Sequence, residues 1–348
     1  MSLADQITRL NNAKAAINQS IENKVVTVGE DVKLDKYADY IDNIEIGSGD
    51  SGGGSDSEYA WPNFYELRAK SEHCQYLFSD IIIYEKDTKN KNTIENLDTS
   101  NAFALDFMFN CFNNPSSSYI APEGAIKELD LTKWDVSNAF SFESVFNKCI
   151  LDYLDISGWD FSNNNGTTSY LSLFFNSCIK EVNMTNCNTS KVKSYYRFAF
   201  QAQNLVSIDM TGCDTSKGTS FSSMFAYCPK LTTIIGEIDA SNVNGLYSGA
   251  SSNPFRGSSV LETVYLKNIY KNVTTMKNES KWSLNLADTK VKDECLIYII
   301  NELPDLINDK GLTATDKIVL TLPPTNTLTA DQVQVAIDKG WQVANTTY

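Results

Sequence analysis

Cysteine, histidine, aspartate and glutamate are the side chains of this chain that could bind a metal, form disulfides or catalyse hydrolysis. The chain contains 8 cysteines, 43 aspartates and glutamates, and a single histidine, His73. A zinc site would need closely spaced cysteines with histidine partners, and a hydrolytic triad would need a nucleophile motif near His73. No such pairing and no Walker motif is present. The matches to G-x-S-x-G at 49–53 and to the dinucleotide-binding pattern G-x-G-x-x-G at 47–52 both lie in the Gly/Ser-rich stretch 47–57, whose composition is typical of a flexible linker. We therefore expect no catalytic residue, no metal, no cofactor and no enzyme activity.

Six of the cysteines recur with a regular spacing. Cys111, Cys149, Cys178 and Cys228 share one position of a repeated pattern, and Cys187 and Cys213 share another. This periodicity is typical of core residues, and an unpaired cysteine is among the most buried residue types. We therefore expect reduced, packed thiols rather than disulfides.

Aspartates recur with the same period at Asp135, Asp160, Asp214 and Asp239. If the copies stack, their carboxylates form a ladder that could hold Ca²⁺. Each of these aspartates is also followed two residues later by serine, an arrangement in which the carboxylate commonly caps the backbone of a tight turn. Turn capping is the favoured prediction, and the calcium ladder is the alternative.

The same residues belong to a repeat that occupies about half of the chain. The clearest copies are LDLTKWDVS at 129–137 with VFNKC at 145–149, LDISGWDFS at 154–162 with FFNSC at 174–178, VNMTNCNTS at 182–190 with FAFQA at 198–202, and IDMTGCDTS at 208–216 with MFAYC at 224–228. A partial copy precedes them at 97–111, and a degenerate one, IIGEIDAS, follows at 234–241. The anchoring polar residues Asp98, Asp135, Asp160, Asn188, Asp214 and Asp239 are separated by 37, 25, 28, 26 and 25 residues. A near-constant step of this size is typical of a solenoid.

Each copy has the pattern of one short strand. The alternating apolar residues Leu129 and Leu131 are expected to face a core, to which Trp134 and Phe146 also contribute. Trp159 stands at the position of Trp134 in the next copy. A coil of about 26 residues cannot bury such a face alone, so neighbouring coils must stack and share one core.

These blocks resemble the BspA-like leucine-rich repeat of bacterial and phage surface proteins. The resemblance depends on the Leu-Asp-hydrophobic-Thr/Ser, Trp/Cys-Asp-x-Ser and Met/Phe-Phe-x-x-Cys blocks, which recur together and in order. The chain departs from the pattern in its 37-residue first step, in Gln203 at a cysteine position and in Asn188 at an aspartate position. The resemblance implies a mixed α/β repeat, a leucine-rich-repeat-like solenoid with short strands.

Residues 1–46 are expected to form a helical module for attachment or oligomerisation. Lys14 occupies the missing position of an apolar seam, and such a polar insertion can set the oligomeric state. The alternative is a hairpin in which this helix packs on a second helical segment at 34–44. The apolar seam consists of Leu3, Ile7, Leu10, Ile17 and Ile21.

A Gly/Ser linker at 47–57 follows this helical module, which we call the head. The head and linker together resemble the N-terminal segment of phage tail, baseplate and fibre proteins. The resemblance implies contacts with other virion proteins through the N-terminal helices, and a homo-oligomer, with a trimer favoured.

The solenoid is expected at 97–270 between two caps, because the ends of a repeat array expose its core. Residues 58–96 are rich in aromatic and aliphatic side chains and form the expected N-terminal cap. The expected C-terminal α/β cap is 271–348. Strands are expected near 264–266, 284–286 and 318–322, and helices at 293–303 and 329–339.

Charge and hydropathy exclude several kinds of partner. The net charge of −14 argues against phosphate binding, which needs clustered lysines and arginines, so we expect no nucleic-acid partner. No run approaches the roughly 20 apolar residues of a membrane span, and the N-terminus lacks the pattern of a secretory signal. With the resemblance to phage proteins, this predicts a virion protein that is made in the cytoplasm of a bacterial host.

The loops between the serine of each block and the next phenylalanine vary most between coils. They include 163–170, 191–196, 217–220 and 244–252, and they are rich in Asn, Ser, Gly and Tyr. This composition suits hydrogen bonding and stacking on a host surface glycan or protein. The candidate binding surface is Tyr170, Tyr195, Tyr196 and Tyr247. The alternative is that these loops are solvated turns.

Three functions from different classes fit these features. The favoured function is that of a bacteriophage virion protein, such as a tail fibre, baseplate component or other appendage, whose repeat surface serves host recognition. The first alternative is a bacterial cell-surface adhesin with the same repeat. The second is a polysaccharide-degrading virion appendage, which predicts a cleft of carboxylates and stacked aromatic side chains.

Overall fold

The computed structural model describes residues 76–114, 120–164, 171–246, 253–274, 276, 282–313, 316 and 318–346. All of them belong to a compact unit that extends from Tyr59 to Tyr348. The helical module with its apolar seam, the linker and most of the expected N-terminal cap lie outside the described residues. Tyr170 and Tyr247 of the candidate binding surface lie outside them as well.

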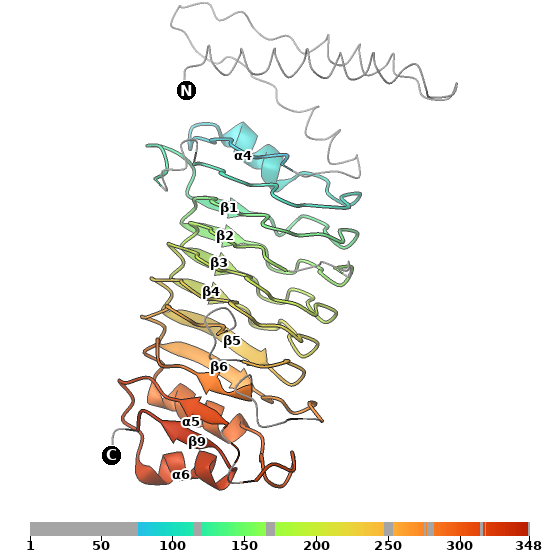
Figure 1. Cartoon of the computed structure of the whole chain (residues 1–348). Helices are drawn as coiled ribbons and strands as arrows, with labels where there is room; N and C mark the ends of the chain where they lie inside the picture. The colour runs from blue at the N-terminus through green and yellow to red at the C-terminus, as the bar shows by residue number, and fades with distance from the viewer. Residues whose placement is uncertain are drawn as a thin grey trace, which may run out of the picture. The chain divides into compact units, whose positions relative to one another are not determined.

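Six short strands build one parallel sheet, in which each strand pairs with the next one along the chain (Figure 1). Equivalent residues of consecutive copies are register partners, such as Leu129 with Leu154 and Val182 with Ile208. This part of the chain is therefore a parallel β-solenoid, and the expected short strands are confirmed. The strands are β1 Glu128–Asp130, β2 Tyr153–Asp155, β3 Glu181–Asn183, β4 Ser207–Asp209, β5 Thr233–Asp239 and β6 Thr263–Lys267.

The repeat consists of strands and turns rather than of strands and helices. Among the described residues between β1 and β6 there is no helix. The expectation of a mixed α/β repeat is wrong in this respect. The physical reason lies in the turns, because each passes through left-handed residues such as Ser144 and Lys148, with φ of 52° and 53°. A left-handed residue interrupts any right-handed helical run.

One core runs through the stacked coils. The central residue of each short strand is buried, as Leu129 and Leu154 illustrate. Behind the strands, buried phenylalanines contact one another from coil to coil, with ring centroids 5.2 to 6.5 Å apart. Each buried phenylalanine contributes about 1.5 to 3 kcal/mol of transfer free energy. The members of this row are Phe109, Phe146, Phe174, Phe198, Phe225 and Phe255.

The stack of coils begins before residue 97. The N–H of Phe78 donates to the carbonyl of Met108 at 2.8 Å, so residues 76–80 already form a turn of the solenoid. Helix α4, Thr88–Glu95, follows this turn. The 37-residue first step includes a segment that returns over the first coil, where Tyr84 and Ala125 form an antiparallel bridge.

A second parallel sheet and two helices follow the last solenoid strand (Figure 1). The helices are α5, Asp293–Glu302, and α6, Ala330–Asp338. The sheet orders β7 Leu284–Asn285, β8 Val319–Thr321 and β9 Gln342–Ala344. The strands and helices expected here are confirmed, and β9 is an addition. No helix in the described ranges is long and apolar enough to cross a bilayer.

Candidate functional site

The repeated aspartates cap turns. The carboxylate of Asp135 accepts the N–H of Ser137 at 3.0 Å and its hydroxyl at 2.6 Å. Asn188 accepts the N–H of Ser190 in the same way, at 3.3 Å, which explains how an asparagine replaces the repeat aspartate. Asp160, Asp214 and Asp239 each accept the N–H of the serine two residues later. The turn-capping prediction is confirmed. Within the described ranges, no three His, Cys, Asp or Glu side chains form a group that could hold a metal ion.

One repeat position links consecutive coils through a side-chain hydrogen bond. It holds either tryptophan or cysteine, and in both cases the side chain donates to a backbone carbonyl of the preceding coil. The two residue types exchange because each fills an apolar slot and carries a donor that reaches this carbonyl. The pairs are Trp134 with Ile94, Trp159 with Leu131, Cys187 with Ile156 and Cys213 with Met184, at 2.8, 2.8, 3.2 and 3.2 Å.

The other four repeat cysteines are buried and form no disulfide, but they do not share one structural position. The N–H of Cys178 donates to the carbonyl of Cys149, which places Cys178 one residue further along its coil. Cys111 lies one residue earlier than Cys149 along its coil. The equivalent bond there runs from the N–H of Ile150 to the carbonyl of Phe112, the residue after Cys111. Of the four, Cys149 and Cys228 are equivalent. Burial raises the pKa of the Cys228 thiol to about 12, so this thiol stays protonated at neutral pH.

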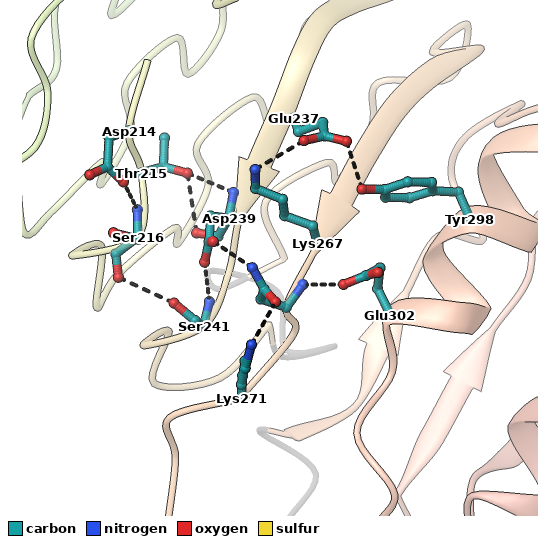
Figure 2. A network of polar contacts seen from close by, with 11 residues as sticks. Asp214, Thr215, Ser216, Glu237, Asp239, Ser241, Lys267, Lys271, Tyr298 and Glu302 are labelled. Atoms are coloured by element: carbon teal, nitrogen blue, oxygen red, sulfur yellow. Dashed lines mark hydrogen bonds and ion pairs between the residues drawn. The ribbon is translucent and has the colours of Figure 1, made fainter. Parts of the chain in front are cut away.

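A polar network joins the last solenoid strands to helix α5 (Figure 2). Glu237 on β5 accepts the hydroxyl of Tyr298 on α5 at 2.7 Å and the ammonium of Lys267 on β6 at 2.9 Å. These two donors lower the pKa of the Glu237 carboxyl. The same carboxylate raises the pKa of Lys267.

Asp239, two residues further along β5, makes the second arm of this network (Figure 2). Its carboxylate accepts the N–H of Ser241 at 2.9 Å and the amide of Asn268 at 2.7 Å. The N–H of Asn268 in turn donates to Glu302 of α5 at 2.7 Å. The hydroxyl of Thr215 accepts the N–H of Asp239 at 2.7 Å, which ties the arm to the preceding coil.

A shallow hollow of about 260 Å³ lies at this network. Both oxygens of Glu237 and both of Asp239 accept hydrogen bonds from other residues of the chain. General acid–base catalysis would need a carboxyl held within reach of a ligand proton. The arrangement fits a junction that fastens the C-terminal α/β unit to the solenoid. The hollow is lined by Met210, Gly212, Cys213, Asp214, Thr215, Glu237, Asp239 and Lys267.

Strand β5 reaches the junction through an irregularity in its pairing with β6. Thr233 pairs with Thr263, whereas Glu237 pairs with Tyr265, so β5 contains extra residues. Gly236 lies within this shift with φ of 93°, and a Cβ there would lie 3.0 Å from the backbone of Met210. Glycine is needed here both for its backbone conformation and for the close approach.

A row of outward side chains follows the turns from coil to coil. Its first half consists of polar side chains that form a chain of hydrogen bonds. The side-chain amide of Asn147 donates to Asn110 at 2.6 Å, and that of Asn110 donates to Ser79 at 3.2 Å. Its second half is aromatic, with ring centroids of Phe175 and Phe200 5.8 Å apart and those of Phe200 and Tyr227 5.6 Å apart. We define the outer row as Ser79, Asn110, Asn147, Phe175, Phe200, Tyr227 and Arg256. All seven are at least partly exposed.

Two arginines border the aromatic half of the outer row. The guanidinium of Arg197 lies 5.0 Å from the ring centroids of both Tyr196 and Phe200. The guanidinium of Arg256 lies 5.7 Å from the ring of Tyr227. Cation–π contacts contribute about 0.5 to 1 kcal/mol each at exposed sites. They keep both cations against the aromatic half of the row.

Two adjacent tyrosines of the candidate binding surface separate in the structure. Tyr195 is fully buried and packs edge-on against Phe198 and Phe221. Its assignment to the binding surface is therefore wrong, because its ring belongs to the core. Tyr196 is half-buried next to Arg197 and borders the outer row.

The aromatic half of the outer row was missed by the sequence interpretation. The block at 174–178 begins with two phenylalanines, of which Phe174 is buried and Phe175 is half-buried. A second aromatic residue directly beside an inward one is therefore the signal that could have identified the row.

The repeat region matches the family described as "Mycoplasma protein of unknown function, DUF285", over residues 81–177 and 167–253. No curated protein and no solved structure matches the chain. The matched residues include strands β1 to β5 and the outer row from Asn110 to Tyr227. The family is described from Mycoplasma and not from phages, and its repeats agree with the BspA-like character of the blocks. Residues 81–253 therefore form a DUF285 repeat domain, folded as a parallel β-solenoid.

Proposed function

We propose that this solenoid is a binding module of a bacterial surface protein, which recognises a glycan or protein of a host and acts without catalysis. The match to a DUF285 repeat supports this assignment over a phage protein. The resemblance of the blocks to BspA-like surface repeats supports display outside the cell.

The outer row is the observation that carries this proposal. Aromatic residues and arginine are the side chains most enriched at binding hot spots. Here Phe175, Phe200 and Tyr227 lie in consecutive turns, with Arg197 and Arg256 beside them. A rigid scaffold holds this set in one orientation, so little conformational freedom is lost when a ligand binds.

A virion appendage is the second candidate function. It is favoured by the sequence of residues 1–57, where the apolar seam and the Gly/Ser linker resemble the head of phage fibre proteins. In this version the head attaches a trimer to other virion proteins, and the outer row faces the bacterial host. Proteomics of purified phage particles and of the washed cell surface separates the two candidates, since each predicts the protein in a different fraction.

The binding function can be tested with substitutions that the solenoid itself provides. Asn110 and Asn147 occupy the row position of Phe175 and Phe200, and Asn176 has the left-handed conformation of Tyr227, with φ of 55° against 59°. The triple variant Phe175→Asn, Phe200→Asn and Tyr227→Asn is therefore expected to fold. Tyr153→Asn on strand β2 is the control, because it removes one partly buried aromatic ring that is not part of the outer row.

Binding of the labelled full chain to host cells is the measurement. The triple variant is expected to lose most of the binding, whereas the control keeps it. Unfolding curves of both variants must match that of the parent closely. Equal binding by parent and folded triple variant would remove the outer row from the function.

A further inference from the structure

Charge is unevenly distributed around the solenoid. Strands β1 to β5 each carry at least one Asp or Glu. In contrast, the turn stretches of the aromatic half contain two arginines and no acidic residue, at 171–178, 194–204, 219–229 and 253–260. In a chain with a net charge of −14, these turns form a local region of opposite sign. An anionic ligand would therefore be repelled by the sheet side and attracted to the aromatic half of the outer row.

We propose that the aromatic half of the outer row binds a polysaccharide that contains uronic acid residues and therefore carries carboxylate groups. Arg197 binds the carboxylate, and Tyr227, the exposed ring of the row, packs against the sugar. This inference rests on the proposed binding function and specifies its ligand class.

Arg197 is the better placed of the two arginines. Its guanidinium lies against two rings, 5.0 Å from each centroid, and no described residue forms a hydrogen bond or an ion pair with it. Near Arg256 a carboxylate is already present, since Asp288 accepts the N–H of Gly257 at 3.3 Å. A guanidinium presents planar, paired N–H donors that match a carboxylate, and stacking on rings leaves this edge accessible.

The closed backbone of the turns favours a glycan over a peptide. The N–H groups of Asn176, Gln201 and Tyr227 donate to carbonyls of the next coil at 2.8, 2.9 and 2.6 Å. A peptide that adds to a sheet needs an edge with unpaired backbone groups. A sugar needs side chains alone, because its C–H faces pack on aromatic rings and its carboxylate pairs with arginine.

Calorimetric titration of the full chain with hyaluronan oligosaccharides, in which uronic acid alternates with a neutral sugar, tests this proposal. A cello-oligosaccharide of equal length is the uncharged control ligand. Arg197→Gln is expected to weaken hyaluronan binding at least about tenfold, since a hydrogen bond to a charged group contributes about 1.5 to 3 kcal/mol. Arg197→Lys is expected to recover part of the affinity. Lys290→Gln, which removes an exposed charge outside both the outer row and the variable loops, is expected to bind like the parent.

The possible failures are distinguishable. If hyaluronan binds the parent and the Arg197→Gln variant equally, or if the neutral oligosaccharide binds as well as hyaluronan, the carboxylate assignment is overturned. If the parent binds host cells through the outer row but not hyaluronan, and periodate treatment of the cells has no effect, the ligand is a protein. In that case the proposed function stands and this inference falls. If the outer-row triple variant adheres like the parent, both fall.

Discussion

The indole N–H of Trp159 donates a hydrogen bond of 2.8 Å to the backbone carbonyl of Leu131 in the preceding coil. The carbonyl of Leu131 also accepts the backbone N–H of Trp134 in its own coil, at 3.1 Å. One carbonyl thus joins a turn to its neighbour, and Cys187 repeats the inter-coil bond with its thiol. The solenoid is stabilised along its axis by side chains as well as by its sheet.

Replacing Trp159 by phenylalanine is expected to lower the free energy of unfolding by about 1 to 3 kcal/mol. The loss combines one neutral hydrogen bond, about 0.5 to 1.5 kcal/mol, with lost packing in a fully buried site. Urea unfolding followed by circular dichroism measures it. Trp134 stacks on Trp159 with centroids 6.0 Å apart, so the double variant should show non-additive losses. Strict additivity would contradict the coupling.

Asp135→Ala is expected to cost about 0.5 to 2 kcal/mol, because the turn loses both hydrogen bonds from Ser137. Asp135→Asn is expected to cost much less, since Asn188 already caps the equivalent turn through its amide oxygen. Differential scanning calorimetry of both variants tests this difference. The same scans with calcium and with EDTA should superimpose. A melting temperature that rises with calcium would support the alternative that the stacked aspartates bind Ca²⁺.

The repeat could be predicted from the sequence because the interactions that form it connect residues close together in the chain. An Asp-x-Ser cap involves residues two apart, and a single alternation such as that of Leu129 and Leu131 decides which side chains face the core. The period fixes the stacking, so strands β1 to β4 fall where the blocks predict them. The same holds for the capping box of Thr329 and Gln332 at the start of α6.

Features that depend on where each turn begins could not be predicted from the sequence. Whether Tyr195 or Tyr196 faces the core depends on where the chain begins to turn, and no pattern within one coil specifies this. The cysteines shifted by one residue because the coils differ in length around the turns. The junction of Glu237, Lys267 and Tyr298 joins residues up to 61 positions apart, so no local motif contains it. The predictions for the helical module of residues 1–46 stay predictions.

The free energy of unfolding is expected to fall as the pH rises above about 9. Burial raises the pKa of the Cys228 thiol from 9.0 to about 12, so the native state holds a proton that the unfolded chain releases. A raised folded-state pKa stabilises the protein below the unfolded pKa, and this stabilisation is lost between the two values. The slope is about 1.4 kcal/mol per pH unit for each such thiol.

Urea titrations at a series of pH values measure this slope. The Cys228→Ala variant should be less stable at neutral pH, because it loses the bond from the thiol to the Ala199 carbonyl at 2.9 Å. It should nevertheless lose stability less steeply at alkaline pH. Parallel pH profiles for parent and variant would show that the thiol ionises at its ordinary pKa in the folded protein.

Gly236→Asn and Gly158→Asn should differ strongly, although both glycines have positive φ, 93° and 78°. A Cβ added at Gly158 would have no described atom within 4 Å, and Asn186 holds the equivalent place in the next coil with φ of 58°. This substitution is expected to be nearly neutral. At Gly236 a Cβ would press on the backbone of Met210 at 3.0 Å, so overpacking should cost about 1 to 3 kcal/mol. Because Gly236 lies in β5 beside Glu237, its substitution should also increase hydrogen exchange in α5, which the Tyr298 hydroxyl ties to β5. Unchanged exchange in α5, in a variant that is measurably destabilised, would show that the junction does not depend on the irregularity in β5.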